Sequence, residues 1–173
     1  MAKKGLEEVV EQLEEDISTD SDPVIKSSGS STAKKALDIM RDVKGFYVLT
    51  AAQRKKVIVK FAEKGYIIYG KAFDLVRVSG RLKPKFDDEK WIEKYFERIT
   101  ICEIKSTDKS SIPDSFKGYF FSISTAELLV AQSLKNKFLF IFVNVPNFVY
   151  DELRLQDIYS RTKNIYPSWS VSF

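Results

Sequence analysis

The run FLFIFVNV at positions 138 to 145 constrains the fold more than any other segment. Its apolar residues follow one another without the polar alternation of a half-exposed strand, which is typical of a strand buried on both faces of a sheet. It follows TAELLVAQSLKNK, residues 125–137, which we interpret as a helix capped by Ser124 or Thr125. Helices that alternate with buried strands in this way predict an α/β/α sandwich with a central sheet.

The other elements are predicted from periodicity and from turn residues. Helices are expected at 6–17, at 33–43 with Thr32 as N-cap, at 51–64 between Thr50 and Gly65, at 85–99 and at 151–163; strands are expected at 66–70, 73–80, 99–105, 119–124 and 164–173. Trp91, Tyr95 and Phe96 have helical spacing and are interpreted as core. Residues 18–32 are rich in Ser, Asp, Pro and Gly and predict a flexible linker. The chain thus divides into 1–31, an acidic helix with its linker, and 32–173, an α/β domain.

The absence of histidine and of glycine-rich nucleotide-binding motifs limits the kinds of catalytic site that this chain can form. The 173 residues contain no histidine and one cysteine, Cys102, which excludes Ser/His/Asp and Cys/His catalysis and metal sites built from histidine. Neither GxGxxG nor GxxxxGK[ST] occurs, so a nucleotide-cofactor site has no support. An enzyme with this composition has to work with carboxylates and lysine.

Charge is distributed unevenly along the chain. Residues 1–22 carry a net charge of −6. Because the whole chain carries +4, residues 23–173 carry +10. A strongly basic body predicts a polyanionic partner, most often nucleic acid. Candidate phosphate contacts are Arg54, Lys55, Lys56, Lys60, Arg81 and Lys83, although a solvated helix face would have the same composition. No apolar run is long enough to span a membrane and no signal sequence is present, so we expect a cytoplasmic protein.

The segment ITICEIK at 99 to 105 places charged residues at the end of a buried strand. Strand alternation puts Ile99, Ile101, Glu103 and Lys105 on one face, with the acid and the amine at the carboxyl end, where sites form in α/β sheets. In the preceding strand, Asp74 shares a face with two valines. If the two strands are neighbours, both acids converge into the oxygen-rich site that Mg²⁺ prefers. A surface ion pair, worth at most about 1 kcal/mol, is the alternative interpretation of Glu103 and Lys105.

This arrangement, Asp74 followed by Glu-x-Lys at 103–105, resembles the PD-(D/E)XK nuclease superfamily. The segment VIVKFAEKGYIIYGKAFDLVRV resembles the helix, glycine turn and strand that precede the metal-binding Asp in resolvase-like and restriction-like members. EIKST followed by GYFFSISTAELLVAQSLKNKFLFIFVNV is similar to the nuclease-like domain at the C-terminus of Protein NO VEIN and its bacterial relatives, and the resemblance covers about residues 50–170. Phe73 stands where the motif has proline, as in divergent members. The helix before Asp74 offers Gln53 and Glu63 as a further acidic or amide group, and neither is assigned. The insertion around 83–97 either contacts DNA or covers the sheet.

The resemblance implies a restriction-endonuclease-like α/β/α sandwich with a central mixed sheet and a Mg²⁺-dependent DNA endonuclease, with Mn²⁺ able to replace Mg²⁺. By position it implies Asp74, Glu103 and the carbonyl of Ile104 as metal ligands and Lys105 as the residue that positions the attacking water. We expect duplex DNA as substrate in restriction, repair or defence, and either a homodimer or a larger complex through the acidic N-terminal helix. A non-catalytic DNA-binding or assembly subunit with the same fold is the first alternative, and an RNA-binding structural protein is the second.

Overall fold

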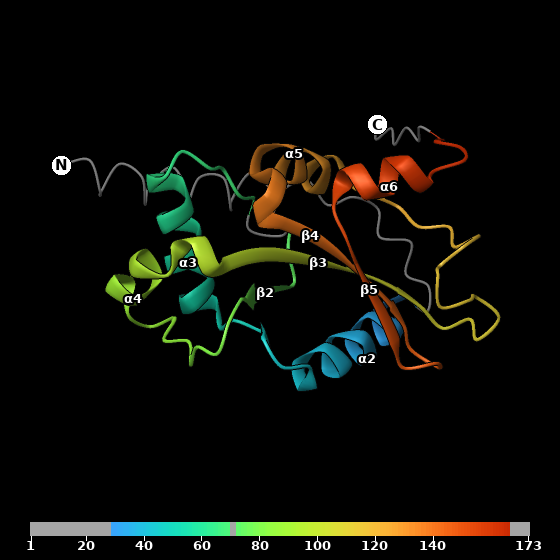
Figure 1. The fold of residues 1–173 in the computed structure, drawn as a ribbon, viewed down its shortest axis with the longest axis horizontal. Coiled ribbons are helices and arrows are strands. Elements are labelled where there is room, and N and C mark those ends of the chain that lie inside the picture. Colours follow the sequence, from blue (N-terminus) through green and yellow to red (C-terminus); the bar gives the residue numbers. More distant parts are fainter. Residues whose placement is uncertain (1–28, 70–71, 167–173) are drawn as a thin grey trace, which may run out of the picture.

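The computed structural model describes residues 29–69 and 72–166 (Figure 1). Its strands form one open sheet in the order β1-β2-β3-β4-β5. The strands are β1 (Phe46–Tyr47), β2 (Leu75–Val78), β3 (Ile99–Thr107), β4 (Phe138–Asn144) and β5 (Val149–Leu153). The helices are α2 (Gly29–Asp42), α3 (Ala51–Glu63), α4 (Glu89–Lys94), α5 (Thr125–Leu134) and α6 (Leu155–Arg161). The predicted helix at 6–17 and most of the predicted linker lie outside the described residues.

The sheet is mixed, and β3 lies at its centre. β3 pairs antiparallel with β2, with Leu75 opposite Cys102 and Val78 opposite Ile99. On its other side β3 pairs in parallel with β4 after a crossover through α5. β1 and β5 complete the two edges in antiparallel pairing. The structure therefore confirms an α/β fold, and β3, which carries Glu103, is the neighbour of β2, which begins one residue after Asp74.

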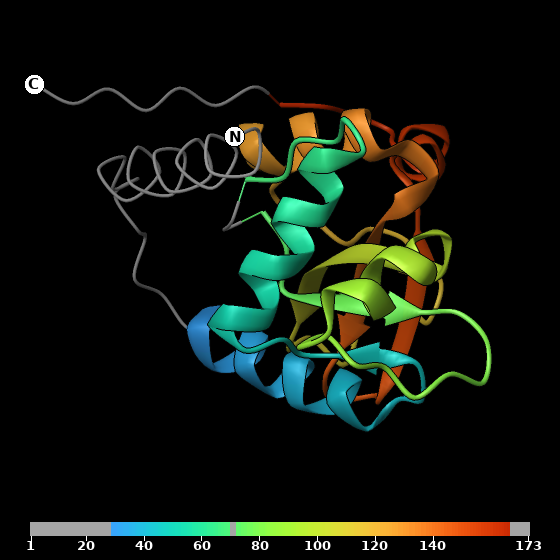
Figure 2. The same cartoon turned by 90° about the vertical axis from the view of Figure 1, so that its left-hand side faces the viewer.

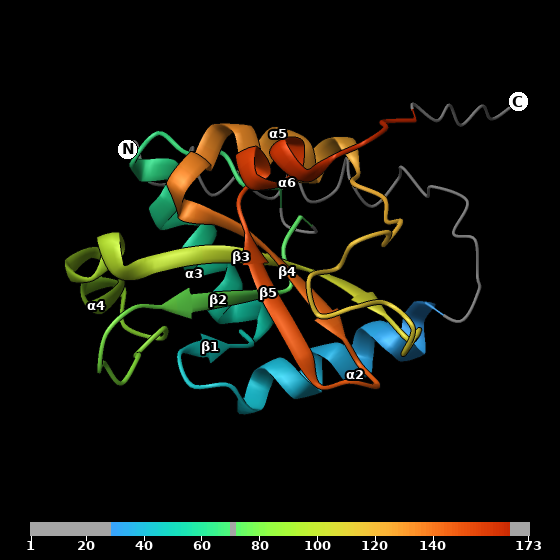
Figure 3. The same ribbon diagram turned by 45° about the vertical axis from the view of Figure 1, so that its right-hand side comes forward.

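Helices cover both faces of this sheet (Figure 3). On one face, α2 packs its small stripe, Ala36 and Met40, against strand residues that include Leu75, Cys102 and Ile141. On the other face, α3, α4, α5 and α6 contribute buried residues to a larger aromatic core. Figure 2 shows α2 and α3 on different sides of the strands. No helix in the described part of the chain is both long and apolar enough to cross a membrane.

Contacts across the α2 face join strands that are not neighbours in the sheet. Arg77 on β2 forms a 2.7 Å ion pair with Glu152 on β5. The rings of Phe46 on β1 and Tyr150 on β5 meet edge to face with centroids 6.2 Å apart. Because β5 and the β1–β2 pair lie at opposite edges of the sheet, these contacts require the sheet to curve toward α2.

Several predicted boundaries are confirmed. Thr50 is the N-cap of α3, and Gly65, with a φ of +83°, follows its last turn. Ser124, one of the two predicted caps, is the N-cap of α5. Residues 99–107 and 138–144 are strands. The core interpretation is confirmed for Trp91 and Phe96, which are buried, and Tyr95 packs half-buried against the same core.

Other predictions were wrong because tertiary packing replaced the expected local structure. Residues 66–69 and 119–124 form no strand; the second segment does alternate, but it packs Tyr119, Phe121 and Ile123 on the core without a neighbouring ladder. The predicted helix at 151–163 is the strand β5 followed by the short helix α6, because its first residues complete the antiparallel pair with β4.

Two further boundaries also differ. Helix α2 begins at Gly29, so Thr32 is not its N-cap and the predicted linker ends earlier, because packing of the helix on the sheet supports an additional turn. The predicted helix at 85–99 contains only α4 and a 3-10 turn at Phe96–Arg98. Residues 164–166 have no regular structure, and the rest of the predicted final strand lies beyond the described residues.

The aromatic core gives a stability prediction. Phe142 on β4 is 2% exposed and its ring contacts Phe116, Tyr119 and Phe121. Truncation in F142A should lower the free energy of unfolding by about 3–5 kcal/mol, because it removes buried apolar surface and leaves a cavity. In the matched control F148A, whose ring is 76% exposed, the change should stay within about 0.5 kcal/mol. Urea denaturation of both variants checks this, and equal effects would contradict the assigned core.

Candidate acid and lysine site

Asp74 lies where the main-chain ladder between β2 and β3 ends. The last pair of that ladder is Leu75 with Cys102, and the amide of Asp74 donates to the carbonyl of Cys102 at 2.9 Å. Two residues further along β3, the amide of Ile104 donates to Oδ2 of Asp74 at 2.8 Å. A carboxylate thus replaces the main-chain acceptor that a longer β2 would have supplied.

Backbone geometry also places the carbonyl of Ile104 at this edge. In an antiparallel ladder the N–H and C=O of one residue point toward the same neighbouring strand. Because the amide of Ile104 points to Asp74, its carbonyl points to the same side, beyond the end of β2. The structure therefore brings the carboxylate of Asp74 and this carbonyl to one edge of β3.

Glu103 lies on the opposite face of β3 from Cys102 and is 7% exposed. Burial, together with the nearby acids Asp74 and Glu127, raises the pKa of its carboxyl group to about 9, while Lys105 acts in the other direction. The Nζ of Lys105 lies 3.3 Å from Oε1 of Glu103. The direction of the shift is upward because desolvation and two other acids outweigh one amine.

Glu127 is the residue of this cluster that the sequence interpretation missed. Its Oε2 accepts from Nζ of Lys105 at 2.7 Å, closer than Glu103, and also from the amide of Ser124 at 3.0 Å. The hydroxyl of Ser124 in turn accepts from the amide of Glu127, which completes a capping box at the start of α5. The side chains of Lys105 and Glu127 are each 12% exposed, so the ion pair is largely shielded from water.

The charges of this cluster do not balance when every group is ionised. The carboxylates of Asp74, Glu103 and Glu127 and the single amine of Lys105 then sum to −2. A bound proton on Glu103 or a divalent cation would offset this charge. Carboxylate and carbonyl oxygens are the donors that Mg²⁺ prefers, so Asp74, Glu103 and the carbonyl of Ile104 fit that ion chemically.

Side chains alone do not complete a metal site. Within residues 29–69 and 72–166, no group of three or more His, Cys, Asp or Glu side chains is arranged to hold a metal ion. Any cation at the edge of β3 would therefore take further ligands from main-chain oxygen, water or substrate, as Mg²⁺ commonly does.

The predicted cations on α3 are engaged by the protein itself. Nη1 of Arg54 donates to the carbonyl of Phe73 at 2.7 Å, and Nζ of Lys56 donates to the carbonyl of Asp87 at 2.7 Å. Lys60 is 6% exposed and lies 2.6 Å from Glu63, a contact that also raises its pKa. Burial therefore keeps Lys60 from contacting a phosphate backbone.

The remaining predicted cations lie in different places. Lys55 is half-buried on α3. Arg81 and Lys83 are exposed in the segment after β2, whose last residue pairs with Ile99, whereas Asp74 precedes β2 at the end next to Glu103. The fold therefore places Arg81 and Lys83 at the other end of β2 from the acids.

The two unassigned groups of the preceding helix also have other partners. Gln53 takes part in the capping box with Thr50 and donates to Asp87 at 2.9 Å. Glu63 pairs with Lys60 at the end of α3. Neither contact directs these side chains to Asp74.

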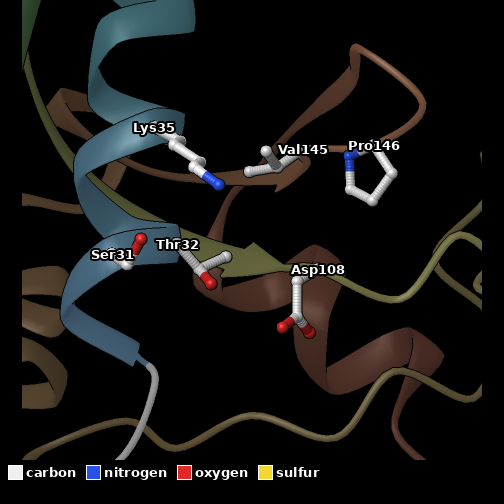
Figure 4. Close-up of a pocket in the computed structure, with 6 residues that line it drawn as sticks. All are labelled: Ser31, Thr32, Lys35, Asp108, Val145 and Pro146. Carbon is white, nitrogen blue, oxygen red and sulfur yellow. The ribbon is translucent and has the colours of Figure 1, made fainter.

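A separate pocket opens on the α2 side, past the carboxyl ends of β3 and β4 (Figure 4). Its lining residues are Ser31, Thr32, Lys35, Asp108, Val145 and Pro146. None of them belongs to the cluster of Asp74, Glu103, Lys105 and Glu127, hereafter the acid–lysine cluster, so the pocket and the cluster are distinct.

Comparison with known proteins adds no identification: no family model matches the chain, and no significant match was found among curated proteins or solved structures.

The raised pKa of Glu103 predicts how stability changes with pH. In the unfolded chain this carboxyl group titrates near 4.5, and in the folded protein near 9, so its protonated form favours folding. That contribution is complete below pH 4.5 and is lost as pH rises toward 9. E103Q, which mimics the protonated acid and does not titrate, should therefore gain stability relative to wild type as pH increases.

Urea denaturation in EDTA at pH 5, 6.5 and 8 measures this difference. The control E97Q changes a carboxylate that is 83% exposed and should give no such trend. A difference between E103Q and wild type that is constant over this range would contradict the buried, protonated state of Glu103.

Proposed function

We propose that this protein is a divalent-metal-dependent phosphodiesterase that cleaves DNA, with a restriction-endonuclease-like fold of the PD-(D/E)XK type. The proposal rests chiefly on one observation. The structure brings Asp74, Glu103 and Lys105 to the same end of neighbouring strands, although 28 residues separate the first two in the sequence. The mixed sheet and the α5 crossover between β3 and β4 are compatible with this fold.

Each group has a role that follows from its position. Asp74, Glu103 and the carbonyl of Ile104 would hold Mg²⁺, which when bound polarises a phosphate and lowers the pKa of water. The ammonium of Lys105 lies next to these oxygens and orients the water that attacks the phosphorus in line. Glu127 accepts from the same ammonium at 2.7 Å and so restricts where it lies. Low exposure of these side chains strengthens each electrostatic contact.

The basic body supports duplex DNA as the substrate. Residues 23–173 carry a net charge of +10, which favours association with a phosphate backbone in any sequence. One site cuts one strand, so cleavage of both strands calls for a dimer or a larger assembly. Restriction, repair and defence are the contexts in which such an activity acts.

A nicking assay tests the activity directly. Wild-type protein should convert supercoiled plasmid to the nicked form only when Mg²⁺ or Mn²⁺ is present. K105A and D74N should reduce the rate at least about 100-fold, as expected for loss of a group that stabilises the transition state. Gel quantification of initial rates measures this, with circular dichroism to show that both variants are folded.

The control for this assay is K109A, which removes an exposed lysine from the segment after β3. It should cleave at the wild-type rate. Cleavage that survives in K105A and D74N, or that needs no divalent ion, would contradict the proposed site.

Metal binding gives an independent prediction. A cation that binds only the folded state stabilises it by about 2.7 kcal/mol at 100 times its dissociation constant. Saturating Mg²⁺ or Mn²⁺ should therefore raise the free energy of unfolding of wild type and should have little effect on D74N. Urea denaturation with NaCl of matched ionic strength measures the difference, and equal stabilisation of both proteins would place the cation elsewhere.

The low exposure of the cluster favours a second candidate function, a non-catalytic nuclease-fold subunit that binds DNA. Lys105 and Glu127 form a short ion pair that is largely shielded from water, and its role would then be to hold α5 against β3. In that case wild type would not nick plasmid but would still bind DNA in a salt-sensitive manner. Binding that is stronger to RNA than to duplex DNA would favour the RNA-binding alternative instead.

A further inference from the structure

Arg54 joins the start of α3 to the residue that precedes Asp74. Its Nη1 donates to the carbonyl of Phe73 at 2.7 Å, and its Cζ lies 4.0 Å from the centroid of the Phe73 ring. Phe73 itself is 2% exposed. One guanidinium therefore contacts both the backbone and the side chain of the same buried residue.

These contacts act on the peptide group that leads directly into Asp74. On one side of it, the Phe73 carbonyl is held by Arg54. On the other side, the amide of Asp74 is held by Cys102, and its carboxylate accepts from Ile104. The orientation of the Asp74 side chain is thus determined by β3 and by α3 together.

The helix that carries Arg54 is itself well anchored. Thr50 and Gln53 form its capping box, and Gln53 also donates to Asp87. Its inner face buries apolar residues such as Val57. Because the start of α3 is held in place, a hydrogen bond from Arg54 restricts the orientation of the Phe73 peptide group.

We propose that Arg54 is a positioning residue that fixes the carboxylate of Asp74 for metal binding, and that it is not a phosphate contact. The planar guanidinium is needed because it donates a hydrogen bond and stacks on a ring at once, which a lysine ammonium does not do. The consequence for catalysis rests on the proposed function. The positioning of Asp74 is testable without it.

Hydrogen exchange at the Ile104 amide reports the positioning directly, because Asp74 accepts that proton. In R54A the exchange rate of this amide, followed by NMR in metal-free buffer, should rise about tenfold, the change expected when one hydrogen bond is lost. The amides of Ile101 and Phe140 in the sheet core should keep their wild-type rates. R54K should behave like R54A, since it keeps the charge but not the planar group.

K56A is the matched control. It removes one positive charge from the same helix, and Lys56 contacts Asp87, not Phe73. Ile104 should therefore exchange at the wild-type rate in K56A. Unchanged Ile104 exchange in R54A, or acceleration of all sheet amides to the same degree, would overturn the proposal.

The nicking assay separates positioning from phosphate contact. Positioning predicts that R54A lowers kcat about tenfold while its affinity for DNA and the salt dependence of that affinity stay unchanged. A phosphate contact predicts weaker DNA binding, with a salt slope smaller by about 1, and wild-type exchange at Ile104, which would overturn the proposal. If wild type proves inactive, the proposed function fails, and the exchange experiment alone still decides the role of Arg54.

Discussion

The hydrogen bond from the Ile104 amide to the Asp74 carboxylate is the interaction on which the candidate site depends. It forms just before the first residue of β2, where a carboxylate side chain, in place of a main-chain carbonyl, accepts the hydrogen bond from β3. A longer β2 would have covered this edge with its own amides and carbonyls. β2 begins at Leu75, so Asp74 lies just outside the strand, close to Glu103. The carbonyl of Ile104 points to the same edge of β3 as the Asp74 carboxylate.

The sequence was sufficient for the strand part of the site. Period-two alternation placed Glu103 and Lys105 on one face, and the strand residues around them are buried as that pattern predicts. It did not reveal Glu127, although a signal was present. The Ser-x-x-Glu pattern at 124–127 fixes the acid in the first turn of α5, and a crossover helix starts near the carboxyl end of the strand before it. Combining the capping box with the crossover would have placed Glu127 next to Lys105.

The remaining errors arose where local preference and tertiary contacts disagree. Tyr119, Phe121 and Ile123 alternate like a strand but satisfy that pattern by packing against the core. Asp151 and Glu152 give β5 a charged composition, and the segment is still a strand because β4 supplies its pairing. The charges of α3 were likewise ambiguous, because a run of Arg and Lys has the same composition whether it faces solvent or, as with Arg54 and Lys56, contacts neighbouring chain segments.

Burial gives the acid–lysine cluster its chemical character. Exposed, these four groups would be solvated individually, and their mutual interactions would be weak. Largely shielded from water, these four groups sum to −2 when all are ionised, and burial together with the neighbouring acids raises the pKa of Glu103 to about 9. A proton and a divalent cation would therefore compete for the same oxygen atoms, while Glu127 keeps the ammonium of Lys105 close to them. With every group ionised and no cation bound, such an arrangement would cost folding free energy.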